Sequence, residues 1–270
     1  MNQSLDIALV SAIIPCYRHV ETLERAVTSV VEQSLPVMEV IIVNDGADLK
    51  VQEAVEALQA KFKDNFIKLV SLPINVGAGE ARNAGWNVAK GQFIAFLDAD
   101  DAWHPQKIFI QYNFMTSHPN IAITGHRHRQ EEGQPDWSGY DVSEGFSPLG
   151  VGKFIFFNQF ITPSVMIQNN PDFRFAKNQR HMEDFGLWLS VALNGHGIVK
   201  LEAELACIFK DPFGESGLSA NLLKMEQGEL LVYWDAAKCR PSLFPGLLIL
   251  YPFSMLKFLR RVFLRFIRRH

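Results

Sequence analysis

The chain has 270 residues, of which 48% are hydrophobic and 20% are charged, and this allows one or two domains with a sizeable core. The net charge of −3 gives no indication of nucleic-acid binding, and we expect no nucleic-acid partner. The three cysteines lie far apart and match no disulfide framework or metal-binding cysteine motif. The first residues carry no positive charge ahead of a short apolar run, so we expect no signal peptide and a cytoplasmic protein.

Strands and helices are predicted to alternate along the first 125 residues. Continuous apolar runs predict strands that are buried on both faces, at residues 7–14, 38–43, 67–72, 93–97 and 121–124. Apolar residues at helical spacing predict helices between them, at residues 21–33, 48–62, 78–89 and 105–118. This order is typical of an α/β fold with a mostly parallel sheet flanked by helices.

The second part of the sequence is less regular. Residues 130–152 are polar and rich in Gly, Ser and Pro, and we interpret them as a long loop. Strands are predicted at 165–167 and 205–210, and helices at 182–193 and 218–238.

Polar residues follow three of the predicted strands at the point where each strand ends. They are found at residues 15–17, 44–46 and 98–101. Because ligands of parallel α/β sheets bind beyond the carboxyl ends of the strands, we expect these segments to meet at one edge and to form a binding site.

Asp98, Asp100 and Asp101 place three mutually repelling carboxylates at the end of a buried strand. Hard divalent cations prefer carboxylate oxygens and often share their coordination with substrate phosphates. Asp98 and Asp100 could therefore offer one carboxylate to a metal ion and the other to the metal or to a ribose. The alternative is that Asp100 or Asp101 caps the helix that follows.

Three more candidates lie near strand and helix ends. Asp45 belongs to an Asn-Asp-Gly turn signal, but at this edge it could also accept hydrogen bonds from a base or a ribose. Gly77 opens a helix whose N-terminus suits an anion. Arg82, one turn into that helix, could reach a phosphate or the Asp98 cluster, or it could make a surface salt bridge.

Glu183 and Asp184 begin an apolar helix in the second part of the chain. The helix dipole would stabilise them there, but a carboxylate in this position could also be a general base, and the sequence leaves both open. His126 and His128 would share one face of a strand, like metal ligands. No third ligand is evident near them, so we favour a solvated or acceptor-facing strand end.

Five segments, in this order, resemble the signatures of family-2 glycosyltransferases with the GT-A fold: residues 12–17, 40–46, 75–85, 96–101 and 183–184. The resemblance implies transfer of a sugar from a nucleotide-diphosphate sugar, usually a uridine one, with inversion at the anomeric carbon. We expect an acceptor hydroxyl on a saccharide or a lipid-linked sugar of surface-polysaccharide synthesis.

The resemblance also implies a GT-A domain at 1–240, with a nucleotide-sugar-binding half at 1–125 and an acceptor-binding half at 126–240. It implies that Asp45 contacts the base and that Arg82 lies near the diphosphate. The nucleotide-binding residues that it implies are Pro15, Tyr17, Asp45, Gly77, Arg82 and Asp98.

By the same resemblance, Asp98 and Asp100 bind Mn²⁺ or Mg²⁺ on the diphosphate. Asp184 is the implied catalytic base, and Glu183 is its neighbour in the acceptor site.

The sequence departs from the family pattern in one respect. Many relatives carry a histidine that reaches the metal, shortly before a Ser-rich segment, but residues 209–219 contain none. Lys210 or Glu215 would substitute for it, or phosphates and water would fill the site. The Gln-x-x-Arg-Trp motif of processive members is absent from the sequence, so we expect the addition of a single sugar.

The segment 241–270 has six basic residues and no acidic one. Its apolar run at 243–256 is interrupted by prolines and a glycine and is shorter than the roughly 20 residues that a spanning helix needs. Residues 255–267 then show helical apolar spacing. We expect an amphipathic helix on an anionic membrane surface, peripheral on the inner face of the cell membrane. The alternative is a core-packing helix with a solvated basic face.

Three other functions would also place acidic residues at the edge of an α/β sheet. One is a sugar-phosphate nucleotidyltransferase, which would release pyrophosphate. A phosphatase is a weaker interpretation, because its aspartate pair usually follows the first strand. The third is a catalytically inactive lipid-surface adaptor of the same fold.

Overall fold

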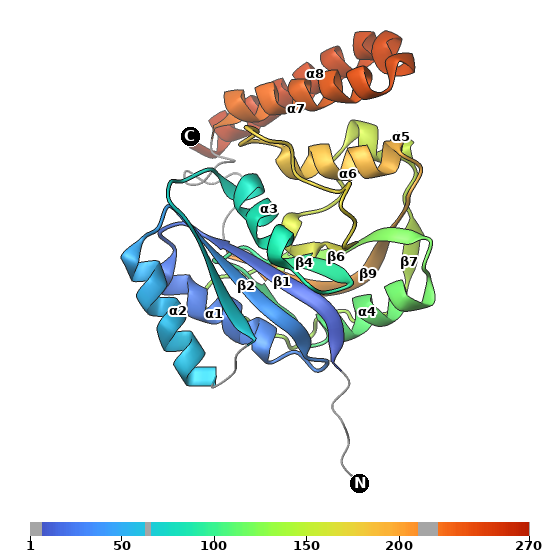
Figure 1. Cartoon of the computed structure of the whole chain (residues 1–270). Helices are drawn as coiled ribbons and strands as arrows, with labels where there is room; N and C mark the ends of the chain where they lie inside the picture. Colours follow the sequence, from blue (N-terminus) through green and yellow to red (C-terminus); the bar gives the residue numbers. More distant parts are fainter. Residues whose placement is uncertain (1–6, 63–65, 210–220, 270) are drawn as a thin grey trace.

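The computed structural model describes residues 7–62, 66–209 and 221–269, and Figure 1 shows their arrangement. Nine strands form one sheet in the order β3-β2-β1-β4-β8-β6-β9-β5, with β7 paired to β9. The strands are β1 (Ala8–Cys16), β2 (Val37–Asp45), β3 (Ile67–Leu72), β4 (Phe93–Phe96), β5 (Ala102–Trp103), β6 (Ile121–Gln130), β7 (Phe146–Pro148), β8 (Met166–Gln168) and β9 (Gly197–Ile208).

Strands β1 to β4 are parallel and apolar toward both faces of the sheet. In β1, Ala12 and Ile14 pack into one core and Ile13 packs into the other, because successive side chains point to opposite faces. The register pairs Cys16 with Asn44. The strands therefore end close together, and the segments that follow them share one edge.

The helices form layers on the two faces of the sheet (Figure 1). One face carries α1 (Val20–Val31), α2 (Leu49–Phe62) and α4 (Lys107–Ser117). The other carries α3 (Ala78–Val88), α5 (Val151–Phe156) and α6 (Glu183–Leu193). Two long helices, α7 (Leu222–Cys239) and α8 (Leu247–Arg269), lie side by side and form an outer layer over α6. Short 3₁₀ helices occupy Thr162–Ser164 and Pro241–Gly246.

The α/β fold predicted from the sequence is confirmed. The first four strands and the first four helices lie within two residues of their predicted ends. The sheet is more mixed than expected, because β8 is antiparallel to both β4 and β6, and β5 and β7 are antiparallel to β9. The strands of each antiparallel pair lie far apart along the chain, so their pairing is set by the tertiary structure and not by local turns.

Strands β6 and β9 are much longer than their predicted apolar runs. They pair with each other over most of their length, and Glu204 on β9 binds Arg127 at 3.2 Å and Arg129 at 2.7 Å on β6. These cross-strand ion pairs support strand structure where the sequence is charged. The polar segment 130–152 was predicted to be a loop, but it also contains β7.

The two histidines of β6 differ in exposure. His126 is buried and His128 is exposed. The expected solvated strand end therefore holds for His128 but not for His126. The register with β9 shifts between His126 and Arg127 and again between Arg127 and His128, and the extra residues lie on β9.

The apolar run near the C-terminus is divided after Gly246, where the 3₁₀ helix ends and α8 begins, but it is not broken at Pro252 as expected. Pro252 lies inside α8, and the helix continues through it. The hydrogen bond that Pro252 forfeits would go to the carbonyl of Leu248, whose side chain is exposed. The segment Pro241–Arg265 is long and apolar enough to cross a membrane by length and composition.

Close packing of α3 on the sheet yields a first prediction. A Cβ at Gly85 would lie 2.8 Å from Ile13 Cγ2 and 3.0 Å from Val43 Cγ2. Gly85→Ala should therefore lower the free energy of unfolding in urea, because overpacking costs about 1–3 kcal/mol. Better helix propensity offsets about 1 kcal/mol of that cost.

The matched control is Gly152→Ala in α5. Nothing lies within 4 Å of a Cβ at that position. This substitution should leave stability unchanged or raise it slightly. Equal unfolding midpoints for the two variants would contradict the close approach of α3 to β1 and β2.

Candidate active site

The side chains predicted to bind a nucleotide gather where β1 and β2 end. Pro15 is the register partner of Val43, and Tyr17 follows β1 directly. The Tyr17 ring lies over the turn after β2, 3.4 Å from where a Cβ of Gly46 would be. Gly46 has φ +124°, a conformation that disfavours other residues. The structure thus brings Pro15, Tyr17 and the end of β2 together.

Asp45 is buried at the end of β2, and its carboxylate holds the loop before α3. Its oxygens accept hydrogen bonds from Val76 N at 2.7 Å, Gly77 N at 3.0 Å and Asn75 Nδ2 at 2.8 Å. Asp45 therefore fixes Gly77, with φ +97°, at the start of α3. A contact between Asp45 and a base stays a prediction.

Arg180 lies beside the same loop, and sequence reasoning did not find it. Its guanidinium donates to Asn75 Oδ1 at 3.1 Å and to the Asn75 carbonyl at 2.9 Å. Its Cγ lies 3.3 Å from the Cβ position of Gly77. A cation therefore stands next to the N-terminus of α3, where an anion would be favoured.

Arg82 joins the two distant acidic segments of the sequence. Its buried guanidinium donates to Asp98 Oδ1 at 2.6 Å and lies 3.4 Å from Glu183 Oε1. Burial by itself would lower the pKa of Arg82, but the charges of Asp98 and Glu183 outweigh burial and raise it. Of the sequence alternatives, contact with the Asp98 cluster is confirmed and a surface salt bridge is excluded. Contact with a phosphate stays a prediction.

Glu183 is buried at the start of α6, next to Asp184. Burial raises the pKa of Glu183 to about 7, and the charge of Asp184 adds to the rise, whereas Arg82 lowers the pKa. Burial also raises the pKa of Asp184, and hydrogen bonds from Phe185 and Asn158 oppose it. A carboxylate whose pKa is moved toward neutrality is suited to accept a proton.

Asn158 is a second residue that the sequence did not reveal. It lies in the turn after α5 and donates from Nδ2 to Asp184 Oδ2 at 2.9 Å. The other carboxylate oxygen of Asp184 accepts from Phe185 N at 2.7 Å. No sequence motif indicates Asn158, because its contact forms only when the turn after α5 and the start of α6 meet in the folded chain.

The aspartates after β4 lie on a tight turn, in which Asp101 N donates to the Asp98 carbonyl at 3.1 Å. Asp98 is partly exposed, and Asp101 is buried. Burial raises the pKa of the Cys16 thiol, and the negative charge of the nearby Asp100 adds to the rise. None of the aspartates caps the next helix, whose N-cap is Gln106, so that alternative was wrong.

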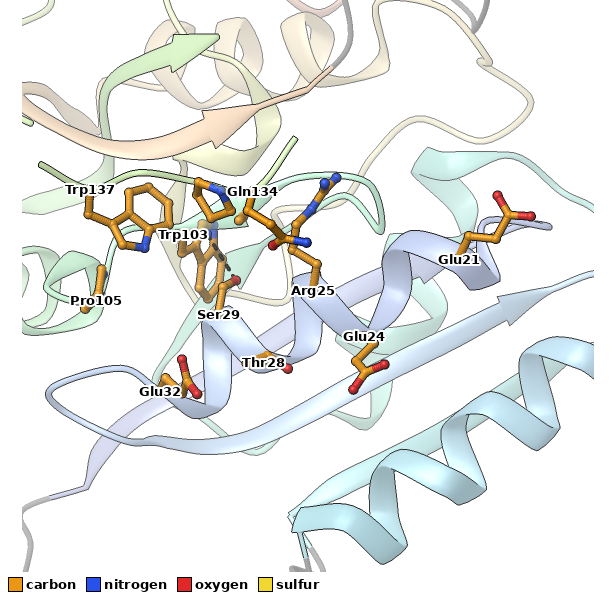
Figure 2. A pocket seen from close by; sticks show the side chains of 12 residues that line it. Glu21, Glu24, Arg25, Thr28, Ser29, Glu32, Trp103, Pro105, Gln134 and Trp137 are labelled. Carbon is orange, nitrogen blue, oxygen red and sulfur yellow. Dashed lines mark hydrogen bonds between the residues drawn. The ribbon is translucent and has the colours of Figure 1, made fainter. Parts of the chain in front are cut away.

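Arg25 of α1 supports the acidic turn from behind. It donates to the Asp100 carbonyl at 2.5 Å and to the Gly133 carbonyl at 3.2 Å, and it lies 3.5 Å from the centre of the Phe209 ring. Arg25 also lines a pocket of about 460 Å³ between α1 and residues 134–137 (Figure 2). None of the site residues predicted from the sequence lines this pocket, so it is separate from the candidate site.

The acidic turn fits a hard divalent cation that brings other ligands with it. Asp98 and Asp100 place two carboxylates on one open turn, and Mg²⁺ is commonly bound by one or two carboxylates together with substrate phosphates and water. In the described ranges, no group of three or more His, Cys, Asp or Glu side chains forms a metal site. The predicted substitutes for a third protein ligand, Lys210 and Glu215, lie outside the described residues.

Comparisons with known proteins identify the family of the chain. The sequence model of the family described as "Glycosyl transferase family 2" matches residues 11–179. The chain is 30% identical over 247 residues to the Escherichia coli "UDP-Glc:alpha-D-GlcNAc-diphosphoundecaprenol beta-1,3-glucosyltransferase WfgD", covering 86% of each chain. It is 28% identical over 188 residues to the Erwinia amylovora "Amylovoran biosynthesis glycosyltransferase AmsE", covering 67% of this chain and 68% of that relative.

The fold is similar to that of a solved glycosyltransferase. The mannosyltransferase PcManGT from Pyrobaculum calidifontis, in complex with GDP-Man and Mn²⁺, superposes with a TM-score of 0.64 at 15% identity. The match covers 94% of this chain and 77% of PcManGT. For three other curated relatives, the matches cover 27%, 30% and 50% of the length of the relative.

The pKa of Glu183 predicts how stability depends on pH. Between pH 4.5 and about 7, the folded protein keeps a proton on Glu183 that the unfolded chain has released. Stability conferred by this group is therefore lost as the pH rises through that window. Relative to the parent, Glu183→Gln should therefore gain about 1–3 kcal/mol in the free energy of unfolding in urea between pH 4.5 and pH 7.5.

Glu144→Gln provides the control for this comparison, because Glu144 is exposed. It should track the parent at both pH values. If Glu183→Gln loses stability more at pH 7.5 than at pH 4.5, the ionised form of Glu183 is favoured in the folded protein, and the stated direction is wrong.

Proposed function

The chain belongs to glycosyltransferase family 2 and has the GT-A fold, and we propose that it transfers one sugar from a nucleotide-diphosphate sugar, with inversion, to an acceptor hydroxyl. The donor that we propose is a UDP-sugar, as in the name of WfgD. The acceptor is a saccharide or a lipid-linked sugar, and the product enters a surface polysaccharide, as the names of relatives suggest.

The observation that carries this proposal is the bridge that Arg82 makes between Asp98 and Glu183. The acidic turn after β4 is suited to a diphosphate with its metal ion, and the start of α6 carries two carboxylates with raised pKa values. One buried side chain holds both groups next to each other. Such a site can hold a leaving group on one side and a base on the other.

On the donor side, Pro15 and Tyr17 contact the nucleotide, and Asp45 orients its base from the end of β2. Gly77 is assigned to the diphosphate because it opens α3, whose N-terminus favours an anion. Arg82 contributes positive charge near the diphosphate, although its own bonds go to carboxylates.

Asp98 and Asp100 would hold Mn²⁺ or Mg²⁺, which offsets the charge that develops on the departing diphosphate. Asp98 would also contact the ribose. The neighbouring Arg82 fixes Asp98 Oδ1 and so orients this carboxylate.

On the acceptor side, Asp184 takes the proton from the attacking hydroxyl. The oxygen of that hydroxyl forms the new bond to the anomeric carbon while the bond to the nucleoside diphosphate breaks. A single displacement of this kind inverts the anomeric configuration without a covalent sugar–enzyme intermediate. Glu183 lines the acceptor site and balances the charge of Arg82.

We also propose that the protein is peripheral on the inner face of the cell membrane and is attached by α8. The outward face of α8 is apolar, with Leu248 81%, Leu256 65% and Phe263 62% exposed. Its inward face carries Lys257 and Arg261, which bind glutamates of α7. This polarity is the reverse of that of a surface helix in water, and it suits contact with lipid.

The pairing of Lys257 and Arg261 revises the expected mode of attachment. Two of the six basic residues assigned to anionic lipid are occupied by buried carboxylates of Glu226 and Glu229. The apolar face therefore provides most of the proposed affinity. Attraction to anionic headgroups remains for exposed basic residues such as Arg260.

Asp184→Asn tests the assignment of the base. With UDP-glucose, UDP-N-acetylglucosamine and GDP-mannose offered in the presence of Mn²⁺, turnover should fall at least about 100-fold, because the amide cannot accept the proton. Thermal stabilisation by UDP with Mn²⁺ should persist, since Asp184 lies on the acceptor side. Release of nucleoside diphosphate rather than pyrophosphate separates this reaction from nucleotidyl transfer.

Asp172→Asn is the matched control, since it makes the same chemical change at an exposed turn. It should keep parental turnover. Undiminished activity of Asp184→Asn would reject the assignment of the base. Absence of turnover with any donor in the parental protein, together with no stabilisation by UDP, GDP or TDP and metal, would reject the proposed function.

Flotation with lipid vesicles tests the proposed membrane contact. Replacing Leu256 and Phe263 with Ser should lower binding to phosphatidylglycerol-containing vesicles more than tenfold, because burying each of these side chains contributes about 1.5–3 kcal/mol. Leu49→Ser serves as the control, because Leu49 is 71% exposed on α2, which lies on another layer. Unchanged flotation of the double variant would contradict the proposed surface.

A further inference from the structure

The turn that carries Asn158 has a defined orientation toward Asp184. Asn158 Nδ2 donates to Asp184 Oδ2 at 2.9 Å, and Asn158 Oδ1 accepts from Phe160 N at 3.3 Å. Because Phe160 N is a donor, the amide oxygen of Asn158 must face it. The amide nitrogen is therefore directed at the carboxylate, and the opposite orientation would break both bonds.

The first end of this turn is held by α8. Lys257 donates from Nζ to the Phe156 carbonyl at 2.8 Å, at the last residue of α5. The Lys257 ammonium also lies 5.4 Å from the centre of the Phe157 ring and 5.1 Å from that of Phe253. A buried carboxylate of α7, Glu229, binds the same ammonium and fixes its position.

The second end of the turn is held by packing on β6. Phe160 is buried, and its ring occupies the space that Gly125 leaves free. A Cβ at Gly125 would come within 2.2 Å of Phe160 Cδ1. The turn can therefore shift only if the sheet or α8 shifts with it.

On this basis, and resting on the proposed role of Asp184, we propose that Asn158 is a positioning residue for the base and that Lys257 of α8 holds the turn in place. Asn158 fixes the Oδ2 side of the carboxylate, while Phe185 N fixes the Oδ1 side. The hydrogen bond from Asn158 favours the ionised carboxylate, which is the form that accepts a proton.

This arrangement gives the C-terminal helix a part in the active site. The helix proposed to contact the bilayer is linked to the acceptor side by two hydrogen bonds and the turn between them. Lys257 binds the Phe156 carbonyl, and Asn158, two residues further along the turn, binds Asp184. Removing the hold of α8 should therefore affect catalysis as well as membrane binding.

The pH dependence of turnover in the full chain tests the role of Asn158. The assay measures release of nucleoside diphosphate from the most active donor of the panel above, with Mn²⁺. In Asn158→Ala, the acid limb of kcat should move up by roughly one pH unit, because the carboxylate loses a bond that stabilises its charge. At pH 7, kcat should fall roughly tenfold while KM for the donor changes less than twofold.

Gln159→Ala is the matched control in the same turn. Among the residues that the structure describes, Gln159 donates to the carbonyls of Lys153 and Phe157 and makes no hydrogen bond to Asp184. Its pH profile should equal that of the parent. An unshifted acid limb in Asn158→Ala, or an equal shift in both variants, would overturn the positioning role.

Lys257→Met tests the contribution of α8. It removes the ammonium but keeps most of the length of the side chain. It should shift the acid limb in the same direction as Asn158→Ala, by a smaller amount. Arg260→Met removes one positive charge from an exposed position of the same helix and should leave the profile unchanged. If Lys257→Met has the same acid limb as the parent, α8 has no part in positioning the base.

A double-mutant cycle on stability provides a measurement that needs no turnover. Asn158→Ala and Asp184→Ala are combined, and urea unfolding of the four proteins is compared at pH 8. The two changes should be non-additive by at least roughly fivefold in the unfolding equilibrium constant, because they share one contact. Additive effects would overturn the contact between Asn158 and Asp184.

These outcomes separate the present inference from the proposed function. If Asp184→Asn keeps full turnover, the assignment of the base fails, whatever Asn158 does. If Asp184→Asn is inactive and Asn158→Ala has a parental pH profile, the base assignment stands and the positioning role fails.

Discussion

The candidate site depends on one buried cation. The guanidinium of Arg82 lies between Asp98 and Glu183, and it is the contact through which the acidic turn of the sheet and the start of α6 meet. Removing one partner of a buried ion pair leaves an uncompensated charge, which typically costs about 3–5 kcal/mol. Because three acidic groups surround it, including Asp184, the cation allows carboxylates to accumulate where they would otherwise repel each other. The clustering of these carboxylates therefore depends on Arg82 of α3.

A second layer of ion pairs fixes the outer helices. Glu226 and Glu229 on α7 are buried, and Lys257 and Arg261 on α8 neutralise them. Two charges of α8 are consequently turned inward, while apolar side chains such as Leu256 and Phe263 face outward. In the segment Pro241–Arg265, only 17% of the most apolar 18-residue stretch is buried. A core helix of a globular protein would be mostly buried. The same contacts that hold α8 on the body therefore create an apolar surface and, through Lys257, reach the turn beside Asp184.

Sequence reasoning was most accurate where structure is set by local pattern. The strands around Ile13 and Phe96 are short apolar runs that are buried on both faces, as expected of central strands of a parallel sheet. Sequence reasoning was less accurate where pairing between distant segments determines the length and register of a strand. In the charged part of β6 the arginines pair with Glu204 of β9, and the register shifts after His126 have no signature in the residues themselves. The helix α8 runs through Pro252, although a proline usually indicates a helix end. Its packing on α7 could not be predicted from the sequence.

The sequence by itself determined the α/β alternation, the acidic turn at the end of a buried strand and the acidic pair at Glu183, because these depend on residue type and on neighbours along the chain. The tertiary structure decided which acid contacts which base. It placed Arg82 between two distant acidic segments, directed Asn158 at Asp184, and turned Lys257 toward α7 instead of toward solvent. The reason is physical: a side chain long enough to bind several partners binds the one that folding brings within about 3 Å, and spacing along the chain does not encode that distance.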